Sequence, residues 1–362
     1  MARCQAPKRS FFVLLGIFFD HSAATACKNQ LCLTKKAHFF VSDVATQPVA
    51  AKLPTFTEAV FVLAWRSVVT RWQLCSFSSM LTSRRLLMNN LRREDSVVSY
   101  LCSLSTMELF TREFGGGSPV IILHGLFGFS DNWQTIAKGL SDQHLVVTPD
   151  LRNHGRSPHL STHSYPEMAE DLRAYMEAHW MFSAAVIGHS MGGKVAMQLA
   201  LTNPDMVERL VVIDIDPGEA EDNHSPFFRA LLGIDLSTIA TRAEVEAYLS
   251  EHITDVGTLQ FLLKNITRTA AGAFAWKMNL PVLWKHYKDI LAPVSGEPFD
   301  KPTLFIRGSL SNYIKPEETA LIQELFPKAV IVTIEGAGHW VHADKPTALL
   351  AVLKDFLSES HP

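Results

Sequence analysis

Short apolar runs alternate with helix-like segments from about residue 107 to the end of the chain. Each apolar run is nearly continuous, as in PVIILHG, which is typical of a strand buried on both faces. This alternation predicts an α/β fold, with a mostly parallel sheet and helices on both faces. The predicted strands are residues 107–114, 119–125, 144–150, 183–188, 207–215, 302–308 and 329–336, and the predicted helices are residues 130–141, 165–180, 192–204, 316–326 and 345–357.

One long interruption divides the alternation. Residues from about 217 to 298 are mostly helix-like and contain several Phe and Trp residues, and the next predicted strand follows them. We therefore predict a helical cap inserted into one α/β domain of residues 105–362. All five cysteines precede residue 103, so this domain has neither a disulfide nor a thiol nucleophile. A core of this size needs no such crosslink.

Residues 1–104 form a basic, acid-poor segment. Residues 1–93 contain 13 Lys and Arg but only three Asp and Glu, whereas the whole chain has a formal net charge of −3. The stretch MLTSRRLLMNNLRR, residues 80–93, mixes Arg and Leu as a mitochondrial targeting helix does. We therefore expect a mitochondrial location. The alternatives are an untargeted cytoplasmic extension and a secretory signal, since the apolar run 11–19 precedes an Ala-Thr-Ala site.

Two classes of partner are not expected. The nine-residue apolar run is shorter than the roughly 20 residues that span a bilayer, so no transmembrane segment is predicted. The slightly acidic net charge gives no indication of nucleic-acid binding.

Ser190 lies between two glycines in VIGHSMGGK, after a predicted strand and before a predicted helix. In that context G-x-S-x-G is the pattern of a nucleophile elbow, a sharp turn that exposes a serine hydroxyl above the sheet. Side chains at positions 188 and 192 would collide with the neighbouring strand and helix, so the pattern needs glycine there. We predict Ser190 as a nucleophile; the alternative is an incidental serine in a glycine-rich turn.

A serine hydroxyl needs a general base, which in this fold type follows the last strand. The segment EGAGHWVHADKP, residues 335–346, lies there. We predict His339 as the base, with His342 as the alternative. A metal site at these two histidines would need a third ligand, and none is evident. No cofactor is expected.

Two backbone N–H groups should stabilise the oxyanion that forms during acyl transfer. One belongs to Met191, which follows the nucleophile. The other should come from the loop after IILHG, from Leu126 or, failing that, Phe127. His124 in the same segment is expected to be structural, and so is Asp150 at another strand end.

The acid behind the base is harder to assign. The loop 307–317 has no Asp, and Ser311 and Asn312 stand where the carboxylate is usually found. The earlier strand ends in VVIDIDPG, and period-two alternation would point Asp214 and Asp216 the same way. We predict Asp214, on the strand next to the nucleophile strand, with Asp216 as the alternative. Ser311 is expected to hydrogen-bond the base or the acid.

Taken together, HGLFG, DLRNHGRSP, GHSMGGK, DIDP and GAGHWVHADKP resemble the α/β-hydrolase superfamily over about residues 105–362. They are most similar to the α/β-hydrolase domain-containing protein 11 family, a mitochondrial serine hydrolase group with small bacterial esterase relatives. The resemblance implies activity on acyl esters, diacylglycerol among them, and a matrix location. It also implies a link to upkeep of the lipoylated 2-oxoglutarate dehydrogenase complex.

The resemblance implies residue roles as well. The family's nucleophile falls on Ser190 and its base on His339. In the bacterial relatives the acid falls on Asp214 and a later serine on Ser311. Another acid, sometimes assigned within the animal family, would fall near Pro281 in NLPVL, where this chain has no carboxylate. This alternative acid therefore has no counterpart in the present chain.

Two functions from different classes follow from these patterns. The first is a serine esterase or lipase that forms an acyl-enzyme on Ser190. The alternative is a non-catalytic protector or scaffold of a mitochondrial enzyme complex, because a fold alone does not imply an activity. The complete set of serine, histidine and aspartate favours the enzyme.

Overall fold

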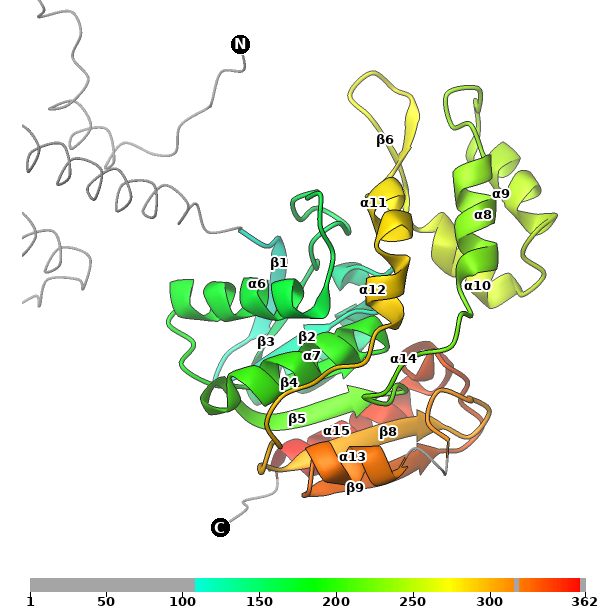
Figure 1. The fold of residues 1–362 in the computed structure, drawn as a ribbon. Helices are drawn as coiled ribbons and strands as arrows, with labels where there is room; N and C mark the ends of the chain where they lie inside the picture. Colours follow the sequence, from blue (N-terminus) through cyan, green and yellow to red (C-terminus); the bar gives the residue numbers. More distant parts are fainter. Residues whose placement is uncertain (1–107, 316–318, 359–362) are drawn as a thin grey trace, which may run out of the picture. The chain divides into compact units, whose positions relative to one another are not determined.

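The computed structural model describes residues 108–315 and 319–358, so the predicted targeting segment lies outside the described residues (Figure 1). Its main sheet has seven strands in the order β1-β3-β2-β4-β5-β8-β9. Only the pair β1–β3 is antiparallel, which confirms the predicted, mostly parallel sheet. The strands are β1 (Thr111–Gly115), β2 (Ser118–Leu123), β3 (His144–Pro149), β4 (Ala184–His189), β5 (Val207–Ile213), β8 (Thr303–Gly308) and β9 (Ala329–Ile334).

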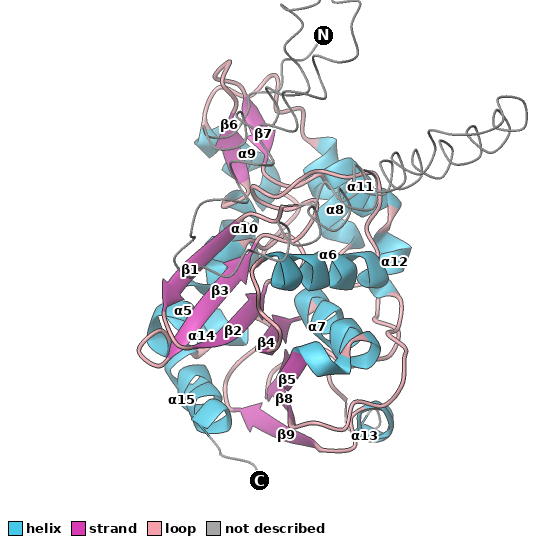
Figure 2. Cartoon of the chain, turned by 90° about the vertical axis from the view of Figure 1, so that its left-hand side faces the viewer, coloured by secondary structure: helices cyan, strands magenta, loops and turns pink. Residues whose placement is uncertain are grey.

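The central strands contribute to two hydrophobic cores, one on each face of the sheet. In β2, Val120 and Ile122 enter one core, and Ile121 and Leu123 enter the other. Burial on both faces explains why the strands are unbroken apolar runs in the sequence. Figure 2 shows α6, α7 and α13 on one side of the sheet and α5, α14 and α15 on the other. These helices are α5 (Gln134–Leu140), α6 (Tyr165–Ala178), α7 (Met191–Thr202), α13 (Thr319–Leu325), α14 (Val341–Asp344) and α15 (Pro346–Ser358), and the 3-10 turns are η2 (Ser130–Trp133) and η3 (Pro204–Met206).

The cap, which we define as residues 217–298, lies between β5 and β8 in the chain and beyond the ends of these strands in space (Figure 1). Apolar faces of its helices extend the core that α6 and α7 share with the sheet. A short hairpin, β6–β7, was not predicted from the sequence. The cap elements are α8 (Ser225–Gly233), α9 (Arg242–Ser250), α10 (Val256–Leu263), β6 (Ile266–Arg268), β7 (Phe274–Trp276), α11 (Leu280–Lys285) and α12 (Tyr287–Leu291).

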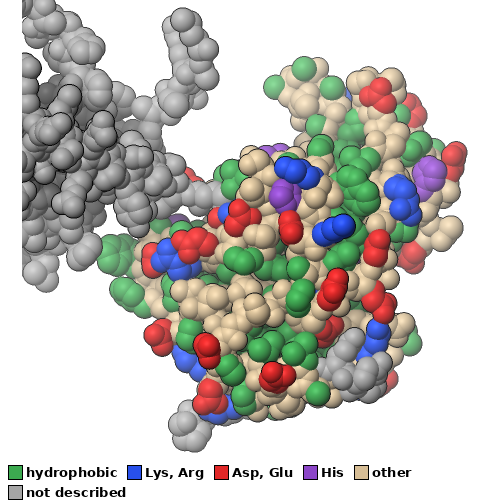
Figure 3. Space-filling model, in the orientation of Figure 1, with side chains coloured by type: hydrophobic (Ala, Val, Ile, Leu, Met, Phe, Trp, Pro, Cys, Tyr) green, Lys and Arg blue, Asp and Glu red, His purple; other side chains and the backbone are tan. Residues whose placement is uncertain are grey.

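The described residues can be characterised by the hydropathy of their helices and by the charges on one face. Within residues 108–315 and 319–358, no helix is both long enough and apolar enough to cross a membrane. On the face seen in Figure 3, acidic and basic side chains are interspersed.

Candidate active site

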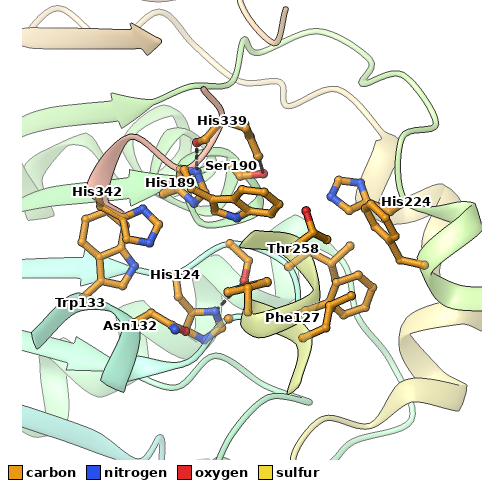
Figure 4. Close-up of a pocket in the computed structure, with 17 residues that line it drawn as sticks. His124, Phe127, Asn132, Trp133, His189, Ser190, His224, Thr258, His339 and His342 are labelled. Carbon is orange, nitrogen blue, oxygen red and sulfur yellow. Dashed lines mark hydrogen bonds between the residues drawn. The ribbon is translucent and has the colours of Figure 1, made fainter. Parts of the chain in front are cut away.

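Ser190 lies at the junction of β4 and α7. Its backbone has φ 53° and ψ −123°, a conformation that costs a residue other than glycine on the order of 1–3 kcal/mol. The N–H of Ser190 donates to the carbonyl oxygen of Ile213 in β5 (3.0 Å), so the neighbouring strand stabilises the strained turn. The side chain is nearly buried and faces a pocket between the sheet and the cap (Figure 4).

The two flanking glycines make this turn sterically possible. A Cβ at Gly188 would lie 2.2 Å from the carbonyl oxygen of Gly192. A Cβ at Gly192 would lie 2.5 Å from the carbonyl oxygen of His124, at the end of β2. Both distances are far below van der Waals contact. The steric role predicted for both glycines is thus confirmed.

A chain of two hydrogen bonds links Ser190 to a buried carboxylate. The Ser190 hydroxyl donates to Nε2 of His339 (3.0 Å), and Nδ1–H of His339 donates to Oδ2 of Asp214 (2.7 Å). The Asp214 side chain is fully buried, whereas the His339 ring keeps 14% of its surface exposed. A serine, an imidazole and a carboxylate in this order can pass a proton from the hydroxyl to the ring and stabilise the resulting imidazolium.

Asp214 is directed at His339 by a turn after β5, not by the period-two alternation of side chains along a strand. Strand β5 ends at Ile213, and Asp214 itself adopts φ 55°, so it is not part of a continuing strand. Its Oδ1 accepts from the N–H of Gly308 (3.0 Å), and its Oδ2 accepts from the Ser311 hydroxyl (2.5 Å). The expectation that Asp216 points the same way was wrong, because its carboxylate accepts from the N–H of Gly218 (2.5 Å) in the first turn of the cap.

Two contacts that orient His339 were not anticipated from the sequence. The Tyr313 ring stacks on the imidazole, with centroids 3.7 Å apart and an interplanar angle of 18°. On the backbone side, Nε2–H of His189 donates to the carbonyl oxygen of His339 (2.8 Å). The stacking restricts the rotation of the ring, and the backbone hydrogen bond holds the loop that carries it. In the sequence, only the presence of a tyrosine two residues after Ser311, in SNYIKP, could have indicated the stacking contact.

The predicted oxyanion donors are Met191, the first residue of α7, and Leu126, in the loop after β2, which lines the pocket with Ser190. In the described part of the chain, neither the N–H of Leu126 nor that of Met191 has a hydrogen-bond acceptor. The N–H of Phe127, the alternative donor, is already bound to Nε2 of His154 (3.2 Å). Two uncommitted N–H groups beside a nucleophile can bind a developing oxyanion. The geometry therefore favours Leu126 over Phe127.

A buried polar network fixes the loop that carries Leu126. Nδ1–H of His124 donates to the carbonyl oxygen of Gly125 (2.9 Å), and Nε2 of His124 accepts from the N–H of Leu151 (2.9 Å). Asp150 is also buried and accepts from the N–H of Ser130 (2.6 Å). Both predicted structural roles are confirmed. Burial lowers the pKa of His124, as befits a neutral ring that donates once and accepts once.

His342, the alternative base, lies elsewhere in the pocket wall. Its ring stacks on Trp133, with centroids 4.3 Å apart and an angle of 23°. Burial lowers the pKa of His342 to about 3, with a smaller contribution from neighbouring His339. No group of three or more potential metal ligands occurs among the described residues.

The pocket that contains Ser190 is lined mainly by apolar and aromatic side chains from the cap and the loops. On its cap side lie residues of α8 and α10 together with the residue preceding α8 (Figure 4). An apolar pocket with a few convergent polar groups is typical of a small-molecule site. The principal lining residues are Leu126, Phe127, Trp133, Ser190, His224, Phe227, Thr258, Phe261, Leu262, His339 and Trp340.

Comparison with known proteins agrees with the geometry. The family model described as alpha/beta hydrolase fold matches residues 118–237. The sn-1-specific diacylglycerol lipase ABHD11 of Mus musculus is 39% identical over 248 residues, which are 66% of this chain and 80% of that protein. Esterase YbfF of Escherichia coli is 37% identical over 243 residues, which are 67% of this chain and 94% of that protein.

A solved structure extends the agreement to three dimensions. A marine microorganism esterase has 44% sequence identity and a TM-score of 0.68, and the match covers 69% of this chain and 99% of that one. The sequence identities of the two relatives and of this structure are high enough, over most of their lengths, to show a shared fold and family. The chain therefore belongs to the α/β-hydrolase family, in the branch that contains ABHD11 and these bacterial esterases.

Proposed function

We propose that the chain is a serine esterase that hydrolyses acyl esters, with lipid esters such as diacylglycerol as the substrate class. The observation that carries the proposal is the hydrogen-bond path from Ser190 through His339 to buried Asp214. Relatives named as an esterase and a diacylglycerol lipase support the ester class, and the apolar pocket suits an acyl chain.

The mechanism follows from the positions of these groups. His339 takes the Ser190 proton as the serine oxygen attacks the ester carbonyl carbon, and Asp214 stabilises the imidazolium. The N–H groups of Leu126 and Met191 bind the oxyanion. Nε2 of His339 then returns the proton to the alcohol oxygen as the C–O bond breaks. Water, activated by the same ring, releases the acid from the acyl-enzyme.

The hydroxyl of Ser311 acts on the acid rather than on the substrate. It donates to the same Asp214 oxygen that accepts from His339. Ser311 is thereby a positioning residue that holds the Asp214 carboxylate in the orientation that His339 needs.

The direct test compares the wild type with Ser190→Ala. We expect the wild type to be labelled by a fluorophosphonate probe and to hydrolyse short-chain and lipid esters, and the variant to show neither property. The rival function is a non-catalytic protector of a mitochondrial complex, such as the 2-oxoglutarate dehydrogenase complex. Equal labelling of both proteins, or rescue of every cellular role by Ser190→Ala, would favour that rival.

The proposal includes a mitochondrial matrix location. Its support is the basic, acid-poor composition of residues 1–93. Import of the full chain into isolated mitochondria, compared with a chain that lacks residues 1–93, tests it. Equal import of both chains would contradict it.

A further inference from the structure

The cap side of the pocket is apolar except at two positions. Phe227, Phe261 and Leu262 present hydrocarbon to the space above Ser190. The Thr258 hydroxyl is committed to capping α10, since it donates to Oδ2 of Asp255 (2.8 Å). The remaining polar side chain of this wall is His224, which Figure 4 shows across the pocket from Ser190 and His339.

The His224 backbone is fixed, but its ring nitrogens are uncommitted. The N–H of His224 donates to the Tyr287 hydroxyl oxygen (3.0 Å), and that hydroxyl donates to Asp222 (2.7 Å). The imidazole lies edge-on to Phe127, with ring centroids 6.1 Å apart. Among the described residues, neither ring nitrogen of His224 has a hydrogen-bond partner. A hydrogen bond between a ligand and such an unpaired polar group would stabilise the bound ligand.

The protonation state of His224 decides which hydrogen bonds its ring can make. Burial lowers the pKa of His224 to about 4, and nearby His339 contributes in the same direction. At neutral pH the ring is therefore uncharged, with one N–H donor and one acceptor nitrogen. An uncharged ring does not favour a carboxylate or a phosphate. It suits a neutral oxygen, such as a hydroxyl group.

This oxygen belongs on the alcohol portion of the ester. A fatty acyl chain has no hydrogen-bonding group to offer and matches the Phe and Leu side chains of the wall. A partial glyceride, in contrast, carries a free hydroxyl close to its scissile ester. His224 lines the same pocket as Ser190, and its ring packs against Phe127, so an ester that reacts at Ser190 lies within its reach.

We propose that His224 selects esters whose alcohol portion carries a free hydroxyl near the scissile bond, by hydrogen bonding to that hydroxyl. The inference rests on the proposed esterase function and names a substrate class for the same site. It makes His224 a specificity-determining residue that contacts substrate.

The test uses two esters of one acid that differ by a single group. In 2-hydroxyethyl hexanoate a hydroxyl replaces the terminal methyl of propyl hexanoate, and the acyl portion is unchanged. We expect His224→Phe to lower the ratio of kcat/KM for hydroxyethyl over propyl ester by about 3- to 10-fold, the range expected for loss of one neutral hydrogen bond. The ratio is the readout, because a general change in the shape of the pocket would lower kcat/KM for both esters alike.

Two further variants make the result specific. His224→Gln keeps an amide donor and should retain more of the ratio than His224→Phe. His252→Phe makes the same substitution at an exposed position of the cap and should leave the ratio unchanged. An unchanged ratio in His224→Phe, an equal loss on both esters, or a ratio in His224→Gln as low as in His224→Phe overturns the proposal. A failure of the esterase function itself is distinct, because the wild type would then cleave neither ester.

Discussion

Asp214 carries the charge that the proposed mechanism needs behind His339. Its carboxylate accepts from His339, Ser311 and the N–H of Gly308, and its side chain is fully buried. Asp214→Asn keeps the shape but removes the charge, and its amide group cannot accept from Nδ1–H in the same way. We expect kcat/KM for a short-chain ester to fall about 10³- to 10⁴-fold with little change in the fluorescence of the folded state.

Asp216→Asn is the matched control for this prediction. Asp216 is two residues further along and binds the N–H of Gly218 instead of His339. Its substitution should change kcat/KM by less than about 10-fold, because it is not part of the path to Ser190. Full activity in Asp214→Asn together with a large loss in Asp216→Asn would reverse the assignment of the acid.

The sequence could predict those site residues whose roles depend on local patterns. Ser190 and His339 each follow a strand in a recognisable motif, and the structure brings their side chains within hydrogen-bond distance. His154 was missed because its contact with Phe127 depends on how two separate loops fold against each other. His224 was missed for the same reason, since only the packing of the cap directs its ring into the pocket.

At the scale of elements, one helix of the sheet layer anchors the cap. Lys194 in α7 is buried, and its ammonium group donates to the carbonyl oxygens of Gly218 and Ala292 (2.8 Å for the second). These two carbonyls belong to the entering and leaving segments of the cap, which also bond to each other through the N–H of Val294 and the carbonyl oxygen of Pro217 (2.9 Å). Lys194 therefore joins both ends of the cap to the sheet domain.

Replacing Lys194 should loosen this connection. Lys194→Met fills a similar volume but leaves two buried carbonyl groups without their donor. Each such group costs roughly 1–3 kcal/mol, so we expect a loss in the free energy of unfolding of that order, measured by urea denaturation. Hydrogen exchange should accelerate in residues 217–220 and 290–295. In Lys138→Met, at an exposed position on α5, neither quantity should change, and equal effects in the two variants would refute the anchoring role.

The sheet and its covering helices were predictable because their signals are local and periodic. Each predicted strand between residues 119 and 336 overlaps a strand of the sheet, since burial on both faces leaves an apolar run. The hairpin β6–β7 could not be predicted, because three-residue strands carry no detectable period. The predicted helix 130–141 divides into a 3-10 turn and α5, which helix-forming residues alone do not reveal.

At the scale of the whole molecule, six of the described histidines have a lowered pKa, and four of them, His124, His189, His224 and His342, line the pocket. Burial lowers the pKa of His163 and His342 to about 3 and that of His224 to about 4. The pKa values of His124, His154 and His189 are lowered as well, each chiefly by burial. In the unfolded chain all six return to about 6.5. The folded protein is therefore the form that binds fewer protons at mildly acidic pH.

This difference predicts a stability that falls with acidification. Between about pH 6.5 and pH 4 the unfolded chain takes up protons that the folded chain does not, so the free energy of unfolding decreases as pH falls. Each histidine contributes up to about 1.4 kcal/mol per pH unit in this range. Above about pH 8 these groups are neutral in both states and contribute no slope. Urea denaturation at a series of pH values measures the slope directly.

One substitution identifies the source of that slope. His342→Phe can keep the stacking on Trp133 but removes a titrating group whose buried Nδ1 has no partner in the described structure. The pH dependence of the unfolding free energy should weaken by about one proton between pH 6.5 and pH 4. His252→Phe, at an exposed site, should leave the dependence unchanged. If both variants titrate like the wild type, carboxylates rather than buried histidines govern acid unfolding.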